Sequence, residues 1–89
     1  KRIAKIFGMR INLDEIEEQL KSKEIIAACI EKKNCILIFV TKEKDIKIVK
    51  QIINTKMKIN LKLIKNKIIN QIPLTHNKKY DYLKLEKKY

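Results

Sequence analysis

The apolar positions of the first thirteen residues alternate weakly with polar ones, and this alternation is interrupted at Gly8. Gly8 is the only glycine of the sequence, and glycine adopts a positive φ at little cost. The pattern therefore predicts two short strands joined by a turn at this glycine. Gly8 serves either the turn itself or the close approach of another group to the backbone.

A helical period follows the second strand. Asn12 and Glu15 have the spacing of a capping box, so we expect a helix from there to about Ser22. The apolar stripe of this helix is formed by Leu13, Ile16 and Leu20, and the residues expected to face water are Glu17, Glu18 and Lys21.

Two apolar runs, at residues 25–30 and 35–41, are separated by a short polar link. A link of this length predicts an antiparallel hairpin. The second run is almost continuously apolar, which is typical of a central strand covered on both faces.

A second helix is predicted over residues 42–55, with Thr41 as its cap. Its buried face is expected to contain Ile46, Val49, Ile52 and Ile53. Residues 56–60 read as a connector, and residues 61–69 as a final strand with poor alternation.

The last stretch, residues 72–85, holds the only proline and the only histidine of the chain. An apolar segment enters a polar turn that presents lysine, and Asp81 then begins a short helical pattern. The whole order of elements predicts a small α+β domain, with helices packed on a three-stranded sheet and an N-terminal two-stranded β-ribbon.

The chain has 89 residues and a net charge of +12, which raises nucleic acid as a partner. Lysine supplies nearly all of this charge, whereas base readout favours arginine, and only Arg2 and Arg10 are arginine. The excess of Lys, Ile and Asn indicates an AT-rich genome. We therefore expect no dedicated nucleic-acid partner, and a small basic nucleic-acid-binding domain is kept as the alternative.

The two cysteines, Cys29 and Cys35, lie in adjoining apolar runs and have one distant histidine as a possible companion. They are predicted to be reduced core thiols of a cytoplasmic protein, and no metal site is expected. No apolar run approaches the roughly 18 residues of a membrane span, and no signal peptide is recognised. Because the sequence begins at Lys1 without methionine, we interpret it as an excised domain.

Two motifs carry a resemblance to a known family. Residues 5–17, K-I-F-G-M-R-I-N-L-D-E-I-E, resemble the K-I-x-G-x-R-I-x-L-x-E-I-E segment of the adenylate-forming enzymes. These enzymes include acyl-CoA synthetases, luciferases and the adenylation domains of nonribosomal peptide synthetases. Residues 72–85, I-P-L-T-H-N-K-K-Y-D-Y-L-K-L, resemble the closing L-P-L-T-x-N-G-K-x-D-R-x-x-L motif of the same superfamily. The middle of the chain matches only in the order of its elements and is shorter than usual.

The resemblance implies that residues 1–89 form the mobile C-terminal lid of an AMP-forming acid–thiol ligase whose large N-terminal domain is absent. It implies ATP and Mg²⁺ as cofactors, bound mainly by that domain. The other expected partners are a carboxylic acid and either coenzyme A or the phosphopantetheine of a carrier protein. The isolated domain is expected to be inactive.

The family's lid alternates between two poses. In the adenylation pose the Lys aligned with Lys79 enters the active site, and in the thiolation pose the ribbon lines the thiol tunnel. The resemblance assigns the tunnel to Gly8, Met9 and Arg10, the hinge to Lys1, and supporting roles to Glu15, Thr75, Asn77 and Asp81.

Two positions depart from the family pattern. Lys78 stands where the motif has glycine, and Tyr82 stands where it has arginine. The first departure leaves Lys78 as an alternative to Lys79, although the spacing from Pro73, Asn77 and Asp81 selects Lys79. Two other hypotheses are that both lysines are simple surface residues and that the domain is a degenerate lid kept for protein–protein contact.

Overall fold

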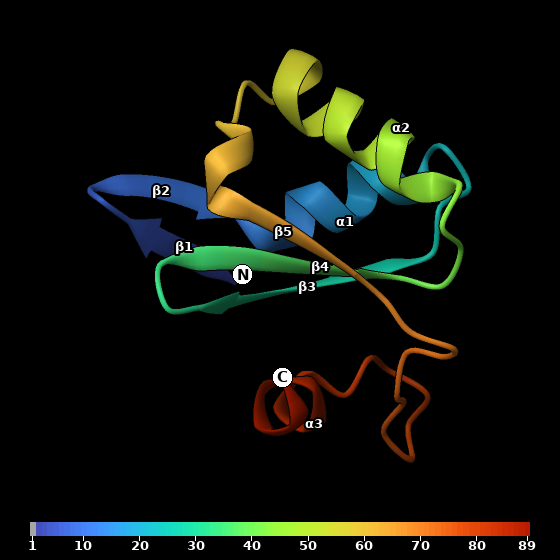
Figure 1. Cartoon of the computed structure of the whole chain (residues 1–89). Coiled ribbons are helices and arrows are strands. Elements are labelled where there is room, and N and C mark those ends of the chain that lie inside the picture. The colour runs from blue at the N-terminus through green and yellow to red at the C-terminus, as the bar shows by residue number, and fades with distance from the viewer. Residues whose placement is uncertain (1) are drawn as a thin grey trace.

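The computed structural model describes residues 2–89 and arranges them in three layers (Figure 1). The middle layer is a sheet of three strands in the order β3 (Ala27–Lys32), β4 (Cys35–Val40) and β5 (Ile64–Ile68). Helices α1 (Leu13–Lys21) and α2 (Asp45–Gln51) lie on one side of the sheet, and α3 (Tyr82–Lys88) lies on the other. The predicted α+β class is confirmed.

The predicted N-terminal ribbon is present and consists of β1 (Ile3–Ile6) and β2 (Met9–Asn12). The turn between them contains two residues, Phe7 at φ 49° and Gly8 at φ 82°. Positive φ at both positions is the conformation of a type I′ hairpin turn, which suits the twist of the adjoining strands. The predicted turn at Gly8 is therefore confirmed.

Strand β4 is the centre of the core. All five residues from Ile36 to Val40 are buried, and their side chains alternate between the two faces of the sheet. One set packs with the cluster under α1 and α2, and Leu37 and Phe39 pack with Ile72 and Leu85 on the side of α3. The expectation of a central strand covered on both faces is confirmed.

The neighbours of β4 are joined to it in two different ways. Strand β3 pairs with it antiparallel through a two-residue turn at Lys33 and Asn34, so the predicted hairpin is confirmed. The strand begins at Ala27 and extends to Lys32, later at both ends than the sequence pattern predicted. Strand β5 pairs with β4 in parallel, which requires the crossover that α2 supplies.

The second helix differs from the prediction at both ends. Thr41 does not cap it, because α2 starts at Asp45 and its cap position, Lys44, makes no side-chain hydrogen bond. The backbone first forms a turn, in which the amide of Asp45 donates to the carbonyl of Lys42 at 3.1 Å. After Gln51 the helix widens into a π-helix, Ile52–Lys56, that keeps Ile52 and Ile53 buried.

The final strand is shorter than predicted. A 3₁₀ turn, Leu61–Leu63, occupies the start of the expected run, and β5 begins only at Ile64. Asn60 caps that turn by accepting a hydrogen bond from the amide of Lys62 at 2.9 Å. A polar side chain that binds the next backbone groups competes with strand formation, which explains the later start.

Candidate functional site

The segment that carries Lys79 is a small hairpin that immediately precedes α3 in the sequence. Leu74 and Tyr80 form an isolated antiparallel bridge, and the amide of Thr75 donates to the carbonyl of Lys79 at 2.7 Å. The amide of Lys78 closes the turn by donating to the carbonyl of Thr75 at 2.9 Å. The result is a tight turn whose tip holds residues 76–78.

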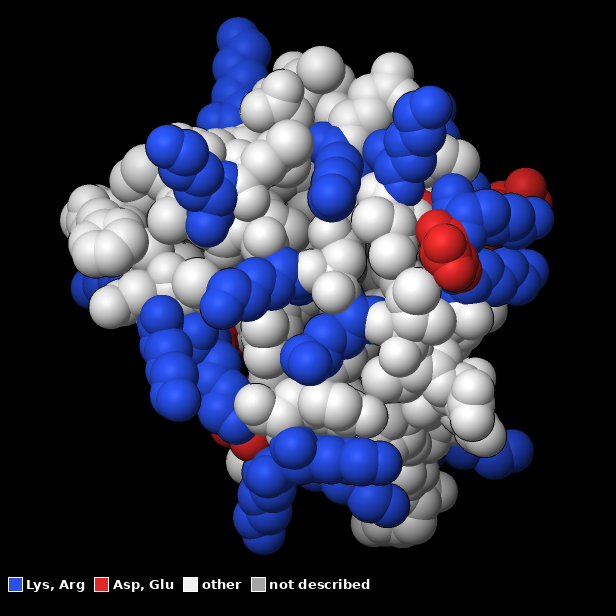
Figure 2. All heavy atoms as spheres, viewed as in Figure 1, with Lys and Arg blue, Asp and Glu red and all other residues white. Residues whose placement is uncertain are grey.

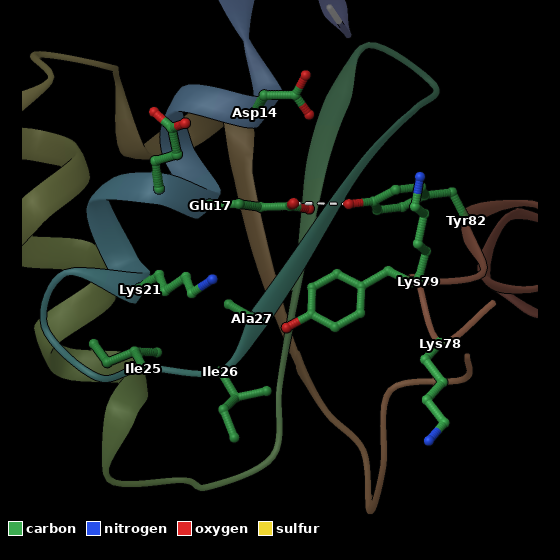
Figure 3. A pocket seen from close by; sticks show the side chains of 11 residues that line it. Asp14, Glu17, Lys21, Ile25, Ile26, Ala27, Lys78, Lys79 and Tyr82 are labelled. Atoms are coloured by element: carbon green, nitrogen blue, oxygen red, sulfur yellow. Dashed lines mark hydrogen bonds between the residues drawn. The ribbon is translucent and has the colours of Figure 1, made fainter. Parts of the chain in front are cut away.

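Lys78 has a φ of 63°, in the left-handed region. A three-residue hairpin loop commonly places its last residue there, and glycine is the residue best suited to that conformation. The position that the family motif fills with glycine is thus a position that needs a positive φ in this chain. Lys79 follows it, and Figure 3 shows the two lysine side chains extending in opposite directions, with Lys79 on the side of Tyr82.

The supporting residues of this motif occupy defined places in the hairpin. The Thr75 hydroxyl accepts a hydrogen bond from the amide of Lys79 at 3.3 Å. Asp81 caps α3 through its side chain, which accepts from the amide of Lys84 at 3.1 Å, and its own amide donates to the carbonyl of Pro73 at 2.8 Å. Asn77 lies exposed at the tip. The predicted helix start at Asp81 is confirmed.

An open cleft of about 670 Å³ separates the Lys79 hairpin from α1 (Figure 3). Helix α1 lines one wall with three carboxylates and Lys21. The chain entering β3 supplies an apolar floor, and the hairpin supplies Lys78, Lys79 and Tyr80. Lys21 and three carboxylates of α1 thus face the same opening as Lys79.

Glu17 does not face water as the helical pattern predicted. Its side chain is only 16% exposed and accepts three hydrogen bonds. The donors are the guanidinium of Arg2 at 2.8 Å, the amide of Cys29 at 2.8 Å and the hydroxyl of Tyr82 at 2.7 Å. The carboxylate of Glu17, on α1, is therefore hydrogen-bonded to the start of the ribbon through Arg2, to the sheet through Cys29 and to α3 through Tyr82.

Arg2 completes this cluster. Besides Glu17, its guanidinium donates to Asp14 at 2.9 Å and to the carbonyl of Cys29 at 2.7 Å. The guanidinium carbon also lies 3.7 Å from the centre of the Tyr82 ring, a cation–π arrangement. Among residues 2–89, the two ion pairs of Arg2 are the only ones.

The cluster changes the protonation of its members. Burial and then the hydrogen bond to Glu17 raise the pKa of Tyr82, so this phenol stays neutral. Partial burial would raise the pKa of Asp14, but the hydrogen bonds and charge of Arg2 outweigh it and lower that pKa. Burial followed by the charge of Glu17 raises the pKa of the Cys29 thiol well above its usual range, so Cys29 stays a thiol.

The residues assigned to the thiol tunnel lie on the ribbon. Gly8 forms its turn, Met9 and Arg10 begin β2, and both of these side chains are exposed. A Cβ at Gly8 would meet no atom within 4 Å among the described residues other than its chain neighbours Phe7 and Met9, so the positive φ alone accounts for glycine there within this domain. Glu15 lies next to them, and its amide donates to the side chain of Asn12 at 3.0 Å, as the cap prediction required.

The structure does not bring the two groups of predicted residues together. The ribbon turn and the Lys79 hairpin project from opposite ends of the molecule (Figure 1). The predicted hinge, Lys1, lies outside the described residues. Sequence reasoning missed Arg2, Glu17 and Tyr82 as a cluster, and the one available signal was an arginine in a chain that otherwise uses lysine.

Cys29 is buried and Cys35 is half-buried, and both are free thiols. Within residues 2–89 no three side chains of His, Cys, Asp or Glu are grouped in a way that would hold a metal ion. None of the helices formed by these residues combines the length and the apolar character that crossing a bilayer requires. Comparisons of the chain with protein-family models, with curated proteins and with solved structures found no match.

Proposed function

We propose that this chain is the mobile C-terminal lid of a cytoplasmic, AMP-forming acid–thiol ligase. The observation that carries the proposal is the backbone of Lys78, which has the positive φ that the glycine of the family motif would supply. This backbone match supports the motif register in which the next residue, Lys79, has the catalytic role. The proposal includes the lid's own N-terminal domain as its main partner.

The chemistry assigned to Lys79 is electrostatic. In adenylation a carboxylate oxygen attacks the α-phosphorus of ATP and pyrophosphate leaves, so two anionic groups must approach each other. An ammonium group reduces their repulsion and stabilises the charge that builds on the phosphate oxygens. The exposed side chain of Lys79, on a short turn, is suited to delivery into a site on another domain.

The second half-reaction is assigned to the ribbon. Gly8 has no Cβ, and beyond Phe7 and Met9 no atom of the described residues lies within 4 Å of where a Cβ would be, so a pantetheine arm has room to pass the turn. Arg10 supplies a charge for a phosphate of the acceptor. The described residues offer no carboxylate cluster for Mg²⁺, so the proposal leaves ATP and Mg²⁺ to the N-terminal domain.

The experiment joins the chain to its N-terminal domain and measures the two half-reactions separately. We expect Lys79→Ala to lower acid-dependent ATP–pyrophosphate exchange about 10²- to 10³-fold, as removal of a preorganised charge does. Thioester formation from preformed acyl-adenylate should change far less. Lys78→Ala is the matched control, since it removes an equal charge from the neighbouring residue.

A bulky substitution at Gly8 should show the reverse pattern, with thioester formation lowered and exchange retained. Equal effects of Lys79→Ala and the Gly8 substitution on both steps would contradict the two-pose proposal. Retained exchange in Lys79→Ala would favour a degenerate lid that serves protein–protein contact.

A second candidate, binding of nucleic acid, rests on one observation. No lysine of residues 2–89 forms an ion pair, and lysine side chains are spread over α2, β5 and α3 on the face that Figure 2 shows. They cover this face broadly and are not confined to one groove, which is the weaker arrangement for a specific site. Affinity for RNA or DNA that falls steeply with salt and is retained at physiological salt would favour this candidate.

A further inference from the structure

Strand β5 lies at the edge of the sheet, because it pairs with β4 on one side and with no strand of residues 2–89 on the other (Figure 1). The amide of Ile69 donates to the carbonyl of Val40 at 2.9 Å. In a parallel ladder alternate residues bond to the same neighbour, so the backbone amides of Asn66 and Ile68 point away from β4. This edge therefore presents unpaired donors and acceptors to which another extended chain can bond.

The side chains of β5 alternate between the two faces of the sheet. Lys65 and Lys67 are both exposed and lie on the face that α3 covers. Their partners in the register are Leu37 and Phe39, which pack on that side. The other three residues of the strand lie on the face of α1 and α2, and Ile68 among them is 49% exposed. The edge thus carries cations on one face and an incompletely covered apolar residue on the other.

Asn66, in the middle of this strand, has an unsatisfied acceptor. Its side-chain oxygen is buried and accepts no hydrogen bond from any described residue. Buried polar atoms of folded proteins nearly always have a partner, and an unpaired one lowers stability. A chain added beside β5 would bring a side chain next to Asn66 on the same face, at the spacing of cross-strand pairs, and a hydroxyl there would supply the donor.

Further cations lie beyond the end of β5. A cleft of about 350 Å³ opens there, and α3 lines it with Lys84 and Lys88. None of the described residues that line this cleft is acidic. Tyr89 also lines it, and the ammonium nitrogen of Lys67 lies 5.5 Å from the centre of that ring, so the cleft adjoins β5. Acidic side chains that project from an added strand toward α3 would therefore meet several lysines that form no ion pair within residues 2–89.

We propose that the free edge of β5 binds an acidic, extended segment of another protein, which adds a strand to the sheet. The backbone of this segment bonds to Asn66 and Ile68, its carboxylates face the lysines on the α3 side, and its apolar side chains cover Ile68. A second copy of this chain does not fit, because pairing of two β5 strands would place lysine beside lysine. The proposal does not depend on the roles assigned to Lys79 and to the ribbon.

The test uses the 89-residue chain and a capped pentapeptide with the order valine, glutamate, threonine, glutamate, valine. This order complements β5 in either direction, with threonine beside Asn66 and a glutamate beside each lysine. We expect peptide binding to protect the amides of Asn66 and Ile68 from hydrogen exchange, because both then donate to its carbonyls. Lys65→Gln and Lys67→Gln should each weaken binding about 2- to 5-fold, since each removes one cross-strand charge pair.

Lys23→Gln is the matched control for these variants. It removes the same charge from an exposed turn before β3, the strand at the other edge of the sheet. Equal weakening by Lys23→Gln would reduce the effect to net charge and overturn the site.

Two peptides methylated on alternate backbone amides test the strand geometry, because one set of amides faces β5 and the other faces solvent. Only one of the two should lose affinity, by about tenfold or more. Equal affinities of the two, or no protection of Asn66 and Ile68 at millimolar peptide, would overturn the proposal. A short single-stranded RNA that is weakened by Lys65→Gln and not by Lys23→Gln, with no binding of the peptide, would assign this edge to nucleic acid instead.

Discussion

Two turns of this small domain carry the residues assigned to two half-reactions, and they are built in contrasting ways. The ribbon turn at Phe7 and Gly8 projects from the body of the domain, and Phe7 at its tip is 77% exposed. The Lys79 hairpin is fixed at its base, because Asp81 caps α3 and Tyr82 binds Glu17 of α1. The ribbon turn thus presents backbone and apolar surface, whereas the hairpin presents two cations, Lys78 and Lys79, from an anchored base.

Of the substitutions considered, the one at the anchor of the Lys79 hairpin, Glu17→Ala, should lower the free energy of unfolding most. Glu17→Ala removes the acceptor of three hydrogen bonds and leaves the guanidinium of Arg2 with one carboxylate fewer. We expect the free energy of unfolding, measured by urea denaturation, to fall by about 2–3 kcal/mol.

Glu18→Ala is the control for this change, because Glu18 is the exposed neighbour on the same helix. It should alter the free energy of unfolding by less than about 0.5 kcal/mol. Similar losses in the two variants would mean that the cluster around Glu17 does not anchor the hairpin.

Tyr82→Phe tests a single bond of this anchor. Loss of the hydroxyl that donates to Glu17 should lower the free energy of unfolding by about 1.5 kcal/mol at neutral pH. The raised pKa of Tyr82 adds a pH dependence. Above about pH 10 the unfolded chain releases this proton while the folded chain retains it, so stability falls as pH rises.

The phenylalanine variant lacks that proton and should show a shallower alkaline loss of stability. Thermal unfolding of both proteins between pH 8 and pH 11 measures the difference. The buried Cys29 contributes equally to both curves, so an identical slope would argue against the proposed effect of Tyr82.

The ribbon turn should respond to backbone changes alone. Gly8→Ala adds a methyl group that meets no neighbour within the domain, but Ala is strained at a φ of 82°. We expect a loss of about 1 kcal/mol in the free energy of unfolding. Gly8→Asn should lose less, because Asn tolerates this conformation, and a larger loss for Asn would point to steric contact instead of strain.

In the turn of the Lys79 hairpin, a substitution that relieves backbone strain should raise the free energy of unfolding. Lys78→Gly relieves the positive φ of Lys78 and should stabilise the domain by about 0.5–1 kcal/mol, a rise in Tm of several degrees. Lys78→Ala removes the same charge but keeps the strain, so it should leave Tm nearly unchanged. A rise of equal size in both variants would assign the gain to charge repulsion among the lysines.

The elements that were predicted correctly are those whose sequence signals lie within a few residues of the element itself. The glycine between two short strands, the capping residues Asn12 and Asp81, and the continuous apolar run of β4 each depend on neighbours a few residues away. The prediction that Thr41 caps the second helix is wrong, and its cause is local as well: a turn closed by the amide of Asp45 and the carbonyl of Lys42 separates Thr41 from the start of α2.

The cluster around Glu17 could not be predicted in the same way. Its partner Tyr82 is 65 residues away along the chain, and the helical pattern placed Glu17 on the polar side of α1. Only the packing of α3 and the start of the ribbon near α1 converts that position into a buried acceptor.

The contacts of Arg2 have a mechanical consequence. The residue is bonded to Asp14, Glu17 and the carbonyl of Cys29, and it covers the ring of Tyr82. The base of the ribbon is thereby bonded to the same helix that binds Tyr82 beside the Lys79 hairpin, so the two segments share one support. Since the two turns project from opposite ends of the molecule (Figure 1), one rotation of the proposed lid as a rigid body would advance one turn as it withdraws the other.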